Sequence, residues 1–281
     1  TVNIAAISKD LQAPAAFIDD NMHVGTDAEL DSDLEKHFEH LRLSGLPDKE
    51  AKRVLGFREG EILGRHFNSV DMTMSITQEK MDRFADLMEQ TLTRPKITLK
   101  QWEQLTGQWE FVLEQLPKVM KALAAGNGEF KKQFTGKPPH TRRWIPKHIR
   151  RAMEETLRML PYENGTVQLQ REAGRREAPP LTTDARGGKN AAAACVTPEG
   201  YKWWRQQEEH INILEAKAVL EYLKDHAATI QGMILPHWVD NSVVVHCLRK
   251  GRSKGRQLND VIRAILELCH KYDIILRTEY I

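Results

Sequence analysis

Apolar residues recur at three- and four-residue steps in six stretches of the chain, and this spacing predicts amphipathic helices. In the third stretch, Trp102, Leu105 and Trp109 share one face, and an aromatic stripe of this kind is typical of a buried core. Thr98 and Gln101 fit a capping box that opens the same helix, which we expect to form a helical hairpin with the helix before it. The predicted helices cover residues 27–45, 77–92, 98–116, 147–160, 206–226 and 256–272.

Shorter apolar runs, bounded by glycine, proline or polar residues, predict β-strands. Residues 52–75 contain such runs broken up by glycines, and more runs lie beyond residue 180. Because those later strands alternate with helices, the C-terminal part is expected to be an α/β domain with a mixed sheet. Its expected strands cover residues 181–185, 191–197, 234–239 and 274–280.

Three further segments differ from these helices and strands. Residues 13–24 run apolar, two acids, apolar, which predicts a β-hairpin with Asp19 and Asp20 at its tip. Residues 126–148 are basic and contain several glycines and prolines, so a loop is expected there. Residues 163–180 are polar and end in two prolines, and we expect an interdomain linker.

The composition is that of an ordinary globular protein, with 41% apolar and 28% charged residues in 281. No apolar run approaches the ~20 residues that a membrane span requires, so no membrane partner is expected. Cys195, Cys247 and Cys269 lack metal-type spacing, which predicts buried, reduced thiols in an intracellular protein of the cytoplasm or nucleus. The chain starts with Thr1 without a leader, so we expect a piece of a longer protein.

The net charge is only +2, but basic residues cluster in two places. Residues 131–158 contain nine lysines or arginines against two glutamates, and residues 249–256 contain five bases and no acid. Clustered bases beside an aromatic residue suit a phosphate backbone, whereas the alternative is a solvated helix face or a loop. The candidate nucleic-acid contacts are Lys131, Lys132, Arg142, Arg143, Trp144, Lys147, Arg150, Arg249, Lys250, Arg252 and Lys254.

Three acids in the C-terminal part occupy positions from which their carboxylates can converge. Asp184 ends one strand-like run, Glu215 lies in a helical pattern 31 residues later, and Asp240 ends another strand-like run after a further 25. Convergent carboxylates repel one another and persist where a divalent metal neutralises them. Two such ions ~4 Å apart activate water and stabilise the leaving oxygen in phosphodiester cleavage. The alternative is two turn residues and one exposed helix acid.

The phrases around these acids resemble the ribonuclease H domain of retroelement reverse transcriptases, most of all the tyrosine-recombinase (DIRS-like) retrotransposon branch. The phrases are Leu-Thr-Thr-Asp-Ala at 181–185, Ile-Asn-Ile-Leu-Glu-Ala-Lys-Ala-Val at 211–219 and Val-Asp-Asn-Ser at 239–242. The resemblance implies a mixed five-stranded sheet and a site in which Asp184, Glu215 and Asp240 bind two Mg²⁺ (or Mn²⁺) ions.

Two departures from the pattern of that family bear on the site. Residues 186–190 stand where the family has an aromatic-glycine phrase, and they fit a plain hairpin turn. The family also has a fourth acid just beyond the last strand, where Asp260 and Glu279 are poor substitutes by position. We therefore expect the fourth acid beyond Ile281, with the domain truncated at its C-terminal end.

The N-terminal half carries further phrases in the order of a reverse transcriptase. Phe-Ile-Asp-Asp at 17–20 resembles the signature of the palm, and Val-Leu-Gly-Phe at 54–57 resembles the strand that starts the primer-gripping hairpin. The resemblance implies that Asp19 is a metal ligand at a catalytic hairpin tip, with Asp20 beside it. The helical hairpin around 105–107 resembles a thumb. The implied parts are the end of the palm (1–75), thumb or connection (76–162), linker (163–180) and ribonuclease H-like domain (181–281).

These observations support three hypotheses. The first is a reverse transcriptase fragment, α+β and helical in its palm and thumb and α/β in its ribonuclease H part. It would bind template–primer duplex and hydrolyse the RNA of RNA–DNA hybrids by two-metal catalysis. Because the other palm strand and the fingers are missing, we do not expect this chain alone to polymerise. The second is a domesticated nucleic-acid-binding or scaffold protein with a decayed site, and the third is another metal-dependent nuclease, such as an integrase or junction resolvase.

Overall fold

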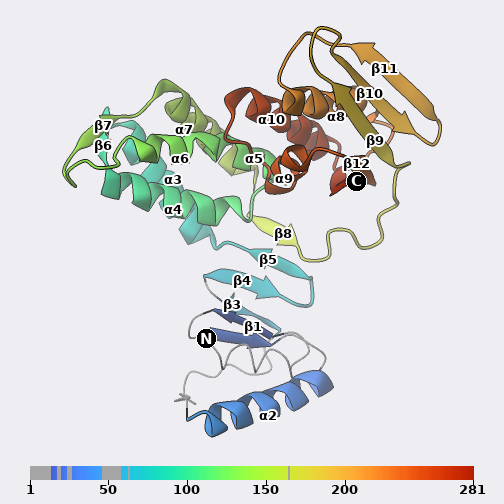
Figure 1. Cartoon of the computed structure of the whole chain (residues 1–281). Coiled ribbons are helices and arrows are strands. Elements are labelled where there is room, and N and C mark those ends of the chain that lie inside the picture. Colours follow the sequence, from blue (N-terminus) through green and yellow to red (C-terminus); the bar gives the residue numbers. More distant parts are fainter. Residues whose placement is uncertain (1–13, 18–19, 24–26, 46–57, 63, 164) are drawn as a thin grey trace. The chain divides into compact units, whose positions relative to one another are not determined.

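The computed structural model describes residues 14–17, 20–23, 27–45, 58–62, 64–163 and 165–281 (Figure 1). The chain divides into two compact units, Thr1–Arg58 and Glu59–Ile281. The primer-grip phrase at 54–57 lies outside the described residues, as do Asp19 and the side chain of Asp20.

The first unit contains a β-hairpin and a helix. Its two strands pair antiparallel, with Phe17 opposite Asp20, so the backbone pairing of the expected hairpin is present. The expected helix is confirmed and ends at a left-handed glycine, Gly45, whose φ of 64° favours a residue without a side chain. The elements are β1 (Pro14–Phe17), β2 (Asp20–His23) and α2 (Asp27–Leu43).

The second unit begins with a small antiparallel sheet and a group of helices. The sheet has the strand order β3-β4-β5-β8, and a separate strand pair joins β6 to β7. The strands are β3 (Glu59–Ile62), β4 (Arg65–Asn68), β5 (Thr73–Ser75), β6 (Lys96–Thr98), β7 (Arg142–Trp144) and β8 (Thr166–Gln168). The α-helices are α3 (Gln78–Leu92), α4 (Leu99–Leu113), α5 (Lys118–Leu123), α6 (Asn127–Lys132) and α7 (Lys147–Met159), with short 3-10 turns at Ala124–Gly126 and Leu160–Tyr162.

The predicted helical hairpin is formed by α3 and α4. The capping box that opens α4 is present, because Gln101 N donates to Thr98 Oγ1 at 3.3 Å and Thr98 N donates to Gln101 Oε1 at 2.9 Å. Trp102, Leu105 and Trp109 are fully buried, so the aromatic stripe is a core face, as the spacing predicted.

The expectation of a loop over residues 126–148 is wrong in part. Residues 127–132 form α6, and residues 142–144 form β7, which pairs with β6. Phe130 and Phe134 are buried four residues apart, and the Phe130 ring meets Trp102 edge-on at 4.8 Å. The glycines and lysines around these two phenylalanines obscure the pattern of a short helix that packs into the core through Phe130.

The polar segment over residues 163–180 is tied to the folded parts on both sides of it. Val167 in β8 pairs with Met74 in β5, and Arg175 Nη1 donates to the carbonyl of Gly232 at 3.1 Å. Ala178 N donates to the carbonyl of Ile234 at 2.8 Å. The segment therefore includes a strand and hydrogen-bonded turns.

The C-terminal part of the second unit is built on a five-stranded sheet with the order β11-β10-β9-β12-β13. β9, β10 and β11 are antiparallel, while β12 lies parallel to both β9 and β13. The expected α/β class with a mixed five-stranded sheet is confirmed. Neither β11 nor α9 was expected. The elements are β9 (Leu181–Arg186), β10 (Ala192–Thr197), β11 (Gly200–Arg205), α8 (Ile211–His226), β12 (Ile234–Val239), α9 (Ser242–Lys250), α10 (Arg256–Lys271) and β13 (Ile275–Tyr280).

One hydrophobic core runs through the second unit and joins its helical and sheet-bearing parts. α10 packs against both α5 and α8, and the Asn259 side chain donates from Nδ2 to the carbonyl of Ala122 at 3.0 Å. Cys195, Cys247 and Cys269 are buried and form no disulfide with one another, as expected from the sequence. Among the described residues, no helix is long and apolar enough to cross a membrane.

Candidate metal centre

Two of the three predicted acids lie side by side on neighbouring parallel strands. Asp184 lies in β9 and Asp240 directly follows β12. The pairing of β9 with β12 runs as far as Thr183 opposite Val239, so the two acids come next on adjacent strands that point the same way. Parallel strands end at the same edge of a sheet, and this brings both carboxylates to one place.

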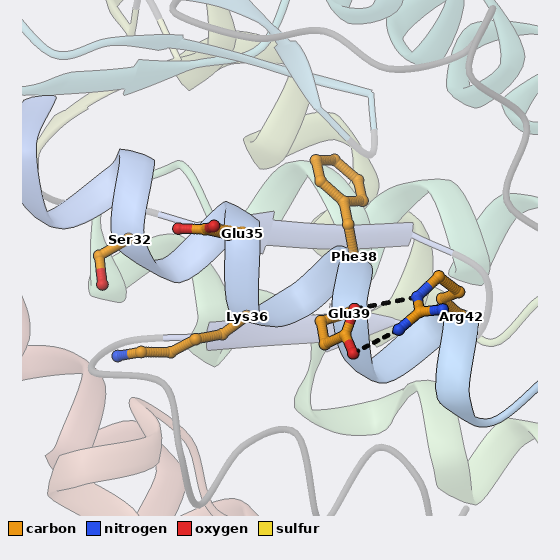
Figure 2. A pocket seen from close by; sticks show the side chains of 6 residues that line it. All are labelled: Ser32, Glu35, Lys36, Phe38, Glu39 and Arg42. Atoms are coloured by element: carbon orange, nitrogen blue, oxygen red, sulfur yellow. Dashed lines mark hydrogen bonds and ion pairs between the residues drawn. The ribbon is translucent and has the colours of Figure 1, made fainter.

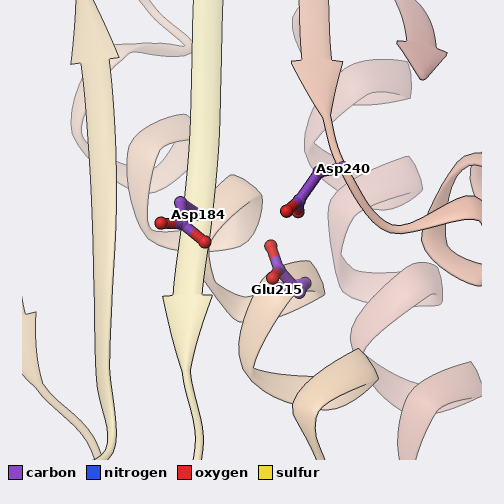
Figure 3. A group of neighbouring side chains, drawn as sticks. All are labelled: Asp184, Glu215 and Asp240. Carbon is purple, nitrogen blue, oxygen red and sulfur yellow. The ribbon is translucent and has the colours of Figure 1, made fainter. Parts of the chain in front are cut away.

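Glu215 reaches the same place from the second turn of α8. One carboxylate oxygen from each of Asp184, Glu215 and Asp240 lies within 4.8 Å of the others, and Figure 3 shows the three side chains pointing toward one another. Ala185 N donates to Glu215 Oε1 at 3.2 Å, which fixes one oxygen of the carboxylate. The other, Oε2, is buried and has no hydrogen-bond partner within the described part of the chain.

The electrostatics of this cluster are unfavourable in the absence of a cation. Burial, and then the nearby charges of Asp240 and Asp184, raise the pKa of Glu215 to about 7. Asp184 and Asp240 are exposed while Glu215 is only 2% exposed, so the cluster opens to solvent on one side.

A divalent ion fits this donor set. Oxygens that ligate one Mg²⁺ at ~2.1 Å lie up to ~4.2 Å apart, so small side-chain rotations would bring the three carboxylates into range. The buried Glu215 Oε2 without a partner is the oxygen that such an ion would satisfy. We therefore regard the three acids as a candidate metal centre.

A pair of asparagines links the two segments that carry Glu215 and Asp240. Asn241 Oδ1 caps α9 by accepting from Val243 N and Val244 N, both at 3.1 Å. Its Nδ2 donates to Asn212 Oδ1 at 2.9 Å. We call this contact the asparagine clasp. Sequence reasoning missed it, although an asparagine three residues before Glu215 shares the helix face of that acid.

A buried polar chain crosses the sheet next to the acids. Thr183 Oγ1 contacts His237 Nε2 at 2.9 Å, and His237 Nδ1 contacts Thr278 Oγ1 at 3.2 Å. Burial lowers the pKa of His237 to about 3, so its ring stays neutral at physiological pH. These hydrogen-bonded side chains join β9, β12 and β13, and they reach β9 at Thr183, the residue before Asp184. The sequence signalled them only through polar residues inside apolar strands.

Several of the predicted basic contacts in the helical part are exposed. Trp144 is 65% exposed, and Lys96 Nζ lies 4.6 Å above its ring. The exposed basic side chains of this group are Lys131, Lys132, Arg142 and Lys147. Within the described part of the chain, Lys131 is the one of these four that makes an ion pair, with Glu103 at 2.9 Å.

Other predicted contacts have internal partners. Arg150 donates from Nη1 to the carbonyl of Leu92 at 2.7 Å and from Nη2 to the carbonyl of Arg94. Arg143 Nε donates to the carbonyl of Gln133 at 3.2 Å. These two arginines hold the helical part together.

The basic run at 249–256 is also used partly inside the protein. Arg249 Nε donates to the carbonyl of Thr278 at 2.9 Å, and Arg252 Nη1 donates to Glu110 Oε1 at 2.5 Å. Lys250 and Lys254 are exposed and, among the described residues, make no ion pair. Half of the four candidate contacts in this run therefore have structural partners.

A shallow hollow on the first unit offers no comparable chemistry. It lies along α2, where Arg42 Nη2 donates to Glu39 Oε1 at 2.7 Å, and Figure 2 shows the lining side chains Ser32, Glu35, Lys36, Phe38, Glu39 and Arg42. The charged groups along this face belong to one helix, and Glu39 and Arg42 pair with each other, so we assign it no site.

No model of a known protein family matches the chain, and no curated protein matches it. Among solved structures, the chain is similar to a foamy viral protease-reverse transcriptase dRH in complex with double-stranded DNA, at 17% identity and a TM-score of 0.44. That match covers 99% of this chain and 48% of the viral one. A foamy viral protease-reverse transcriptase in complex with an RNA/DNA hybrid matches at 16% identity and a TM-score of 0.42, over 99% and 37%.

RNase H1 from the halophilic archaeon Halobacterium salinarum NRC-1 matches at 16% identity and a TM-score of 0.32, over 37% of this chain and 84% of that chain. The chain therefore spans less than half of these two foamy viral chains and a larger share of the archaeal one. At such low identities, the functional proposal rests on the geometry of the acids.

Proposed function

We propose that this chain is a divalent-metal-dependent nuclease of the ribonuclease H type, which hydrolyses the RNA strand of RNA–DNA hybrids. One observation carries the proposal. Asp184, Glu215 and Asp240 arrive from two strand ends and one helix, and their oxygens approach within 4.8 Å, with a buried oxygen of Glu215 unpartnered among the described residues. Three acids from separate elements converge at a cost that a bound cation offsets.

Each acid has a distinct part in this proposal. The amide of Ala185 holds one oxygen of Glu215, which leaves the other, buried oxygen to bind an ion as the deepest ligand. The exposed carboxylates of Asp184 and Asp240 face solvent, from which a phosphodiester approaches. Bound Mg²⁺ or Mn²⁺ ions would supply an activated water and stabilise the leaving oxygen.

The exposed bases supply the affinity for the nucleic acid. Lys132, Arg142, Lys147, Lys250 and Lys254 are exposed and make no ion pair within the described part of the chain. Contacts between such side chains and phosphates would bind a hybrid or a template–primer duplex, with an affinity that falls steeply as salt rises.

The proposal is tested by cleavage of a hybrid whose RNA strand carries an end label, in Mg²⁺ or Mn²⁺. We expect wild type to cut the RNA, and Asp240→Asn to lower the rate by at least about 100-fold, because one ligand carboxylate is lost. Asp260→Asn is the matched control, because it removes an exposed acid from α10, outside the cluster. Equal rates for wild type and Asp240→Asn would contradict the metal-site assignment.

The same assay separates the alternative of a decayed, nucleic-acid-binding descendant. In that case both proteins would bind the hybrid in a salt-dependent way and neither would cut it.

A further inference from the structure

One face of the sheet beside Asp184 is open and carries exposed aromatic residues. Cross-strand partners lie on the same face of a sheet, and the register places Asp184 opposite Ala194, and Ala194 opposite Trp203. These three residues therefore form one row across β9, β10 and β11. The two flanking rows of the same face are Thr182, Val196 and Tyr201 on one side, and Arg186, Ala192 and Arg205 on the other.

The alternate residues of β10 and β11 face α8, which shows that Ala194 and Trp203 point away from this helix. Lys202 Nζ donates to Asp225 of α8 at 2.5 Å, and Cys195 Sγ donates to the carbonyl of Ala218 in α8 at 3.4 Å. Trp204, next to Trp203, packs against the core. Helix α8 thus packs on one face of β9 and β10 and is tied to β11 by Lys202, and the opposite face with Trp203 is open to solvent.

The open face combines aromatic surface with positive charge. Tyr201 is 77% exposed, Trp203 61% and Val196 48%, a degree of exposure unusual for large apolar side chains. Arg186 and Arg205 are exposed and, within the described part of the chain, have no ion-pair partner. We call these five side chains the aromatic platform.

We propose that the aromatic platform is a subsite for unpaired nucleotides of the strand that is cut at the candidate metal centre, which makes this inference dependent on the proposed nuclease function. A base inside a duplex is covered on both faces by its neighbours, so an exposed Trp203 stacks only on an unpaired base. Flanking Arg186 and Arg205 suit the phosphates between such bases. The substrate class is therefore a hybrid with a single-stranded extension beside the cut.

The spacing fits this reading. Trp203 lies two strands away from Asp184, and neighbouring strands are ~4.8 Å apart, so the backbones at the two ends of this row are separated by about 10 Å. That is about three nucleotides of a strand that keeps the stacked helical rise of ~3.4 Å for each nucleotide. We therefore expect preferred cleavage within about three nucleotides of the point where the hybrid ends and the single strand begins.

A second copy of this chain is a less suitable occupant. β11 is an edge strand, and exposed edges are prone to pair with another chain. Symmetric pairing of two copies through this face, however, would bring Arg186 and Arg205 of one copy close to the same cations of the other. The positive charge of the face favours a phosphate-bearing partner.

The subsite is tested by binding of two probes to proteins that carry Asp240→Asn, so that the probes are not cut. The probes are a blunt RNA–DNA hybrid and the same hybrid with a four-nucleotide RNA extension, and fluorescence anisotropy gives both affinities. We expect Trp203→Ala to lower the preference for the extended probe about tenfold, since one stacked base contributes on that scale. Trp203→Phe should restore most of it. Tyr162→Ala, which removes an aromatic side chain 87% exposed outside the sheet, is the control.

An unchanged ratio of the two affinities in Trp203→Ala would overturn the subsite, as would a Trp203-dependent shift from dimer to monomer in sedimentation. These outcomes are separate from a failure of the proposed function. Cleavage of the blunt hybrid by wild type, lost in Asp240→Asn, upholds the nuclease whatever happens to the ratio, and equal cleavage by both proteins overturns the nuclease itself.

Discussion

At the scale of single residues, Glu215 is an acid whose surroundings disfavour its ionised form. It is 2% exposed, and burial raises its pKa to about 7 from an ordinary value of 4.5. The folded protein therefore holds a proton on Glu215 at pH values where the unfolded chain has lost it. Without a cation, this acid contributes stability below pH 4.5 that is lost as pH rises toward 7.

Glu215→Gln should remove that loss of stability. In EDTA, the free energy of unfolding of wild type should fall between pH 4.5 and pH 8 because of Glu215, and the variant should lack this fall. We expect the two proteins to differ in this change by roughly 3 kcal/mol, the equivalent of the pKa shift. Urea unfolding at the two pH values measures the difference. Glu208→Gln, at an exposed acid, is the control. The same pH dependence in Glu215→Gln and wild type would contradict the assigned environment.

His237 makes the comparison between variants necessary. Its pKa is lowered to about 3, so the unfolded chain binds a proton that the folded protein does not between pH 3 and about 6.5. That difference makes stability rise with pH, opposite to the effect of Glu215. Because His237 contributes equally in both proteins, its effect cancels in the difference between the stabilities of wild type and Glu215→Gln. The pH dependence of wild-type stability alone therefore does not test the environment of Glu215.

At the scale of elements, the asparagine clasp joins the start of α8 to the start of α9. It thereby holds Glu215 and Asp240 next to each other. Asn241→Ser keeps a capping oxygen for α9 but is too short to reach Asn212. Asn212→Ala removes the other half of the contact. We expect each variant to weaken Mn²⁺ binding by about tenfold, and the double variant to be no weaker than either.

Calorimetric titration of Mn²⁺ gives the three affinities, and urea unfolding reports stability beside them. Additive losses would show that the two asparagines act independently, and unchanged Mn²⁺ affinity would show that the clasp does not position the acids.

Much of the element pattern could be predicted from the sequence because it is local. The capping box at Thr98 and the stripe through Trp102 were readable directly. β11 escaped prediction because it is an edge strand whose outer face carries Tyr201 and Trp203, so apolar residues do not alternate with polar ones. α6 and α9 have six and nine residues, too few for a helical period to show.

The order of the three acids predicted that their carboxylates converge, whereas the contacts that support them could not be predicted. Asp184 and Asp240 end apolar runs, which is a signal that a single sequence contains. The contacts of Asn212 with Asn241, and of Thr183 with His237, join residues 29 and 54 positions apart. Such pairs depend on strand register and helix placement, which no local pattern fixes.

At the scale of the whole molecule, the second unit uses part of its positive charge to hold itself together. Arg252 bonds Glu110, and Arg263 of α10 bonds Glu155 of α7, so these contacts link the helical part to the sheet-bearing part. A count of basic residues in the sequence could not distinguish these paired arginines from basic side chains that are exposed and without an ion pair. Lys250 and Lys254, by contrast, remain exposed near this junction and available to a phosphate backbone.

The central claim is that Asp184, Glu215 and Asp240 together bind a divalent cation. The most direct measurement is calorimetric titration of Mn²⁺ at pH 8, above the pKa of Glu215, into wild type and the variants Asp184→Asn, Glu215→Gln and Asp240→Asn. Wild type and the control Asp260→Asn should bind alike, and each of the three variants should lose at least about tenfold in affinity. Equal Mn²⁺ affinity in wild type and all three variants would contradict the claim.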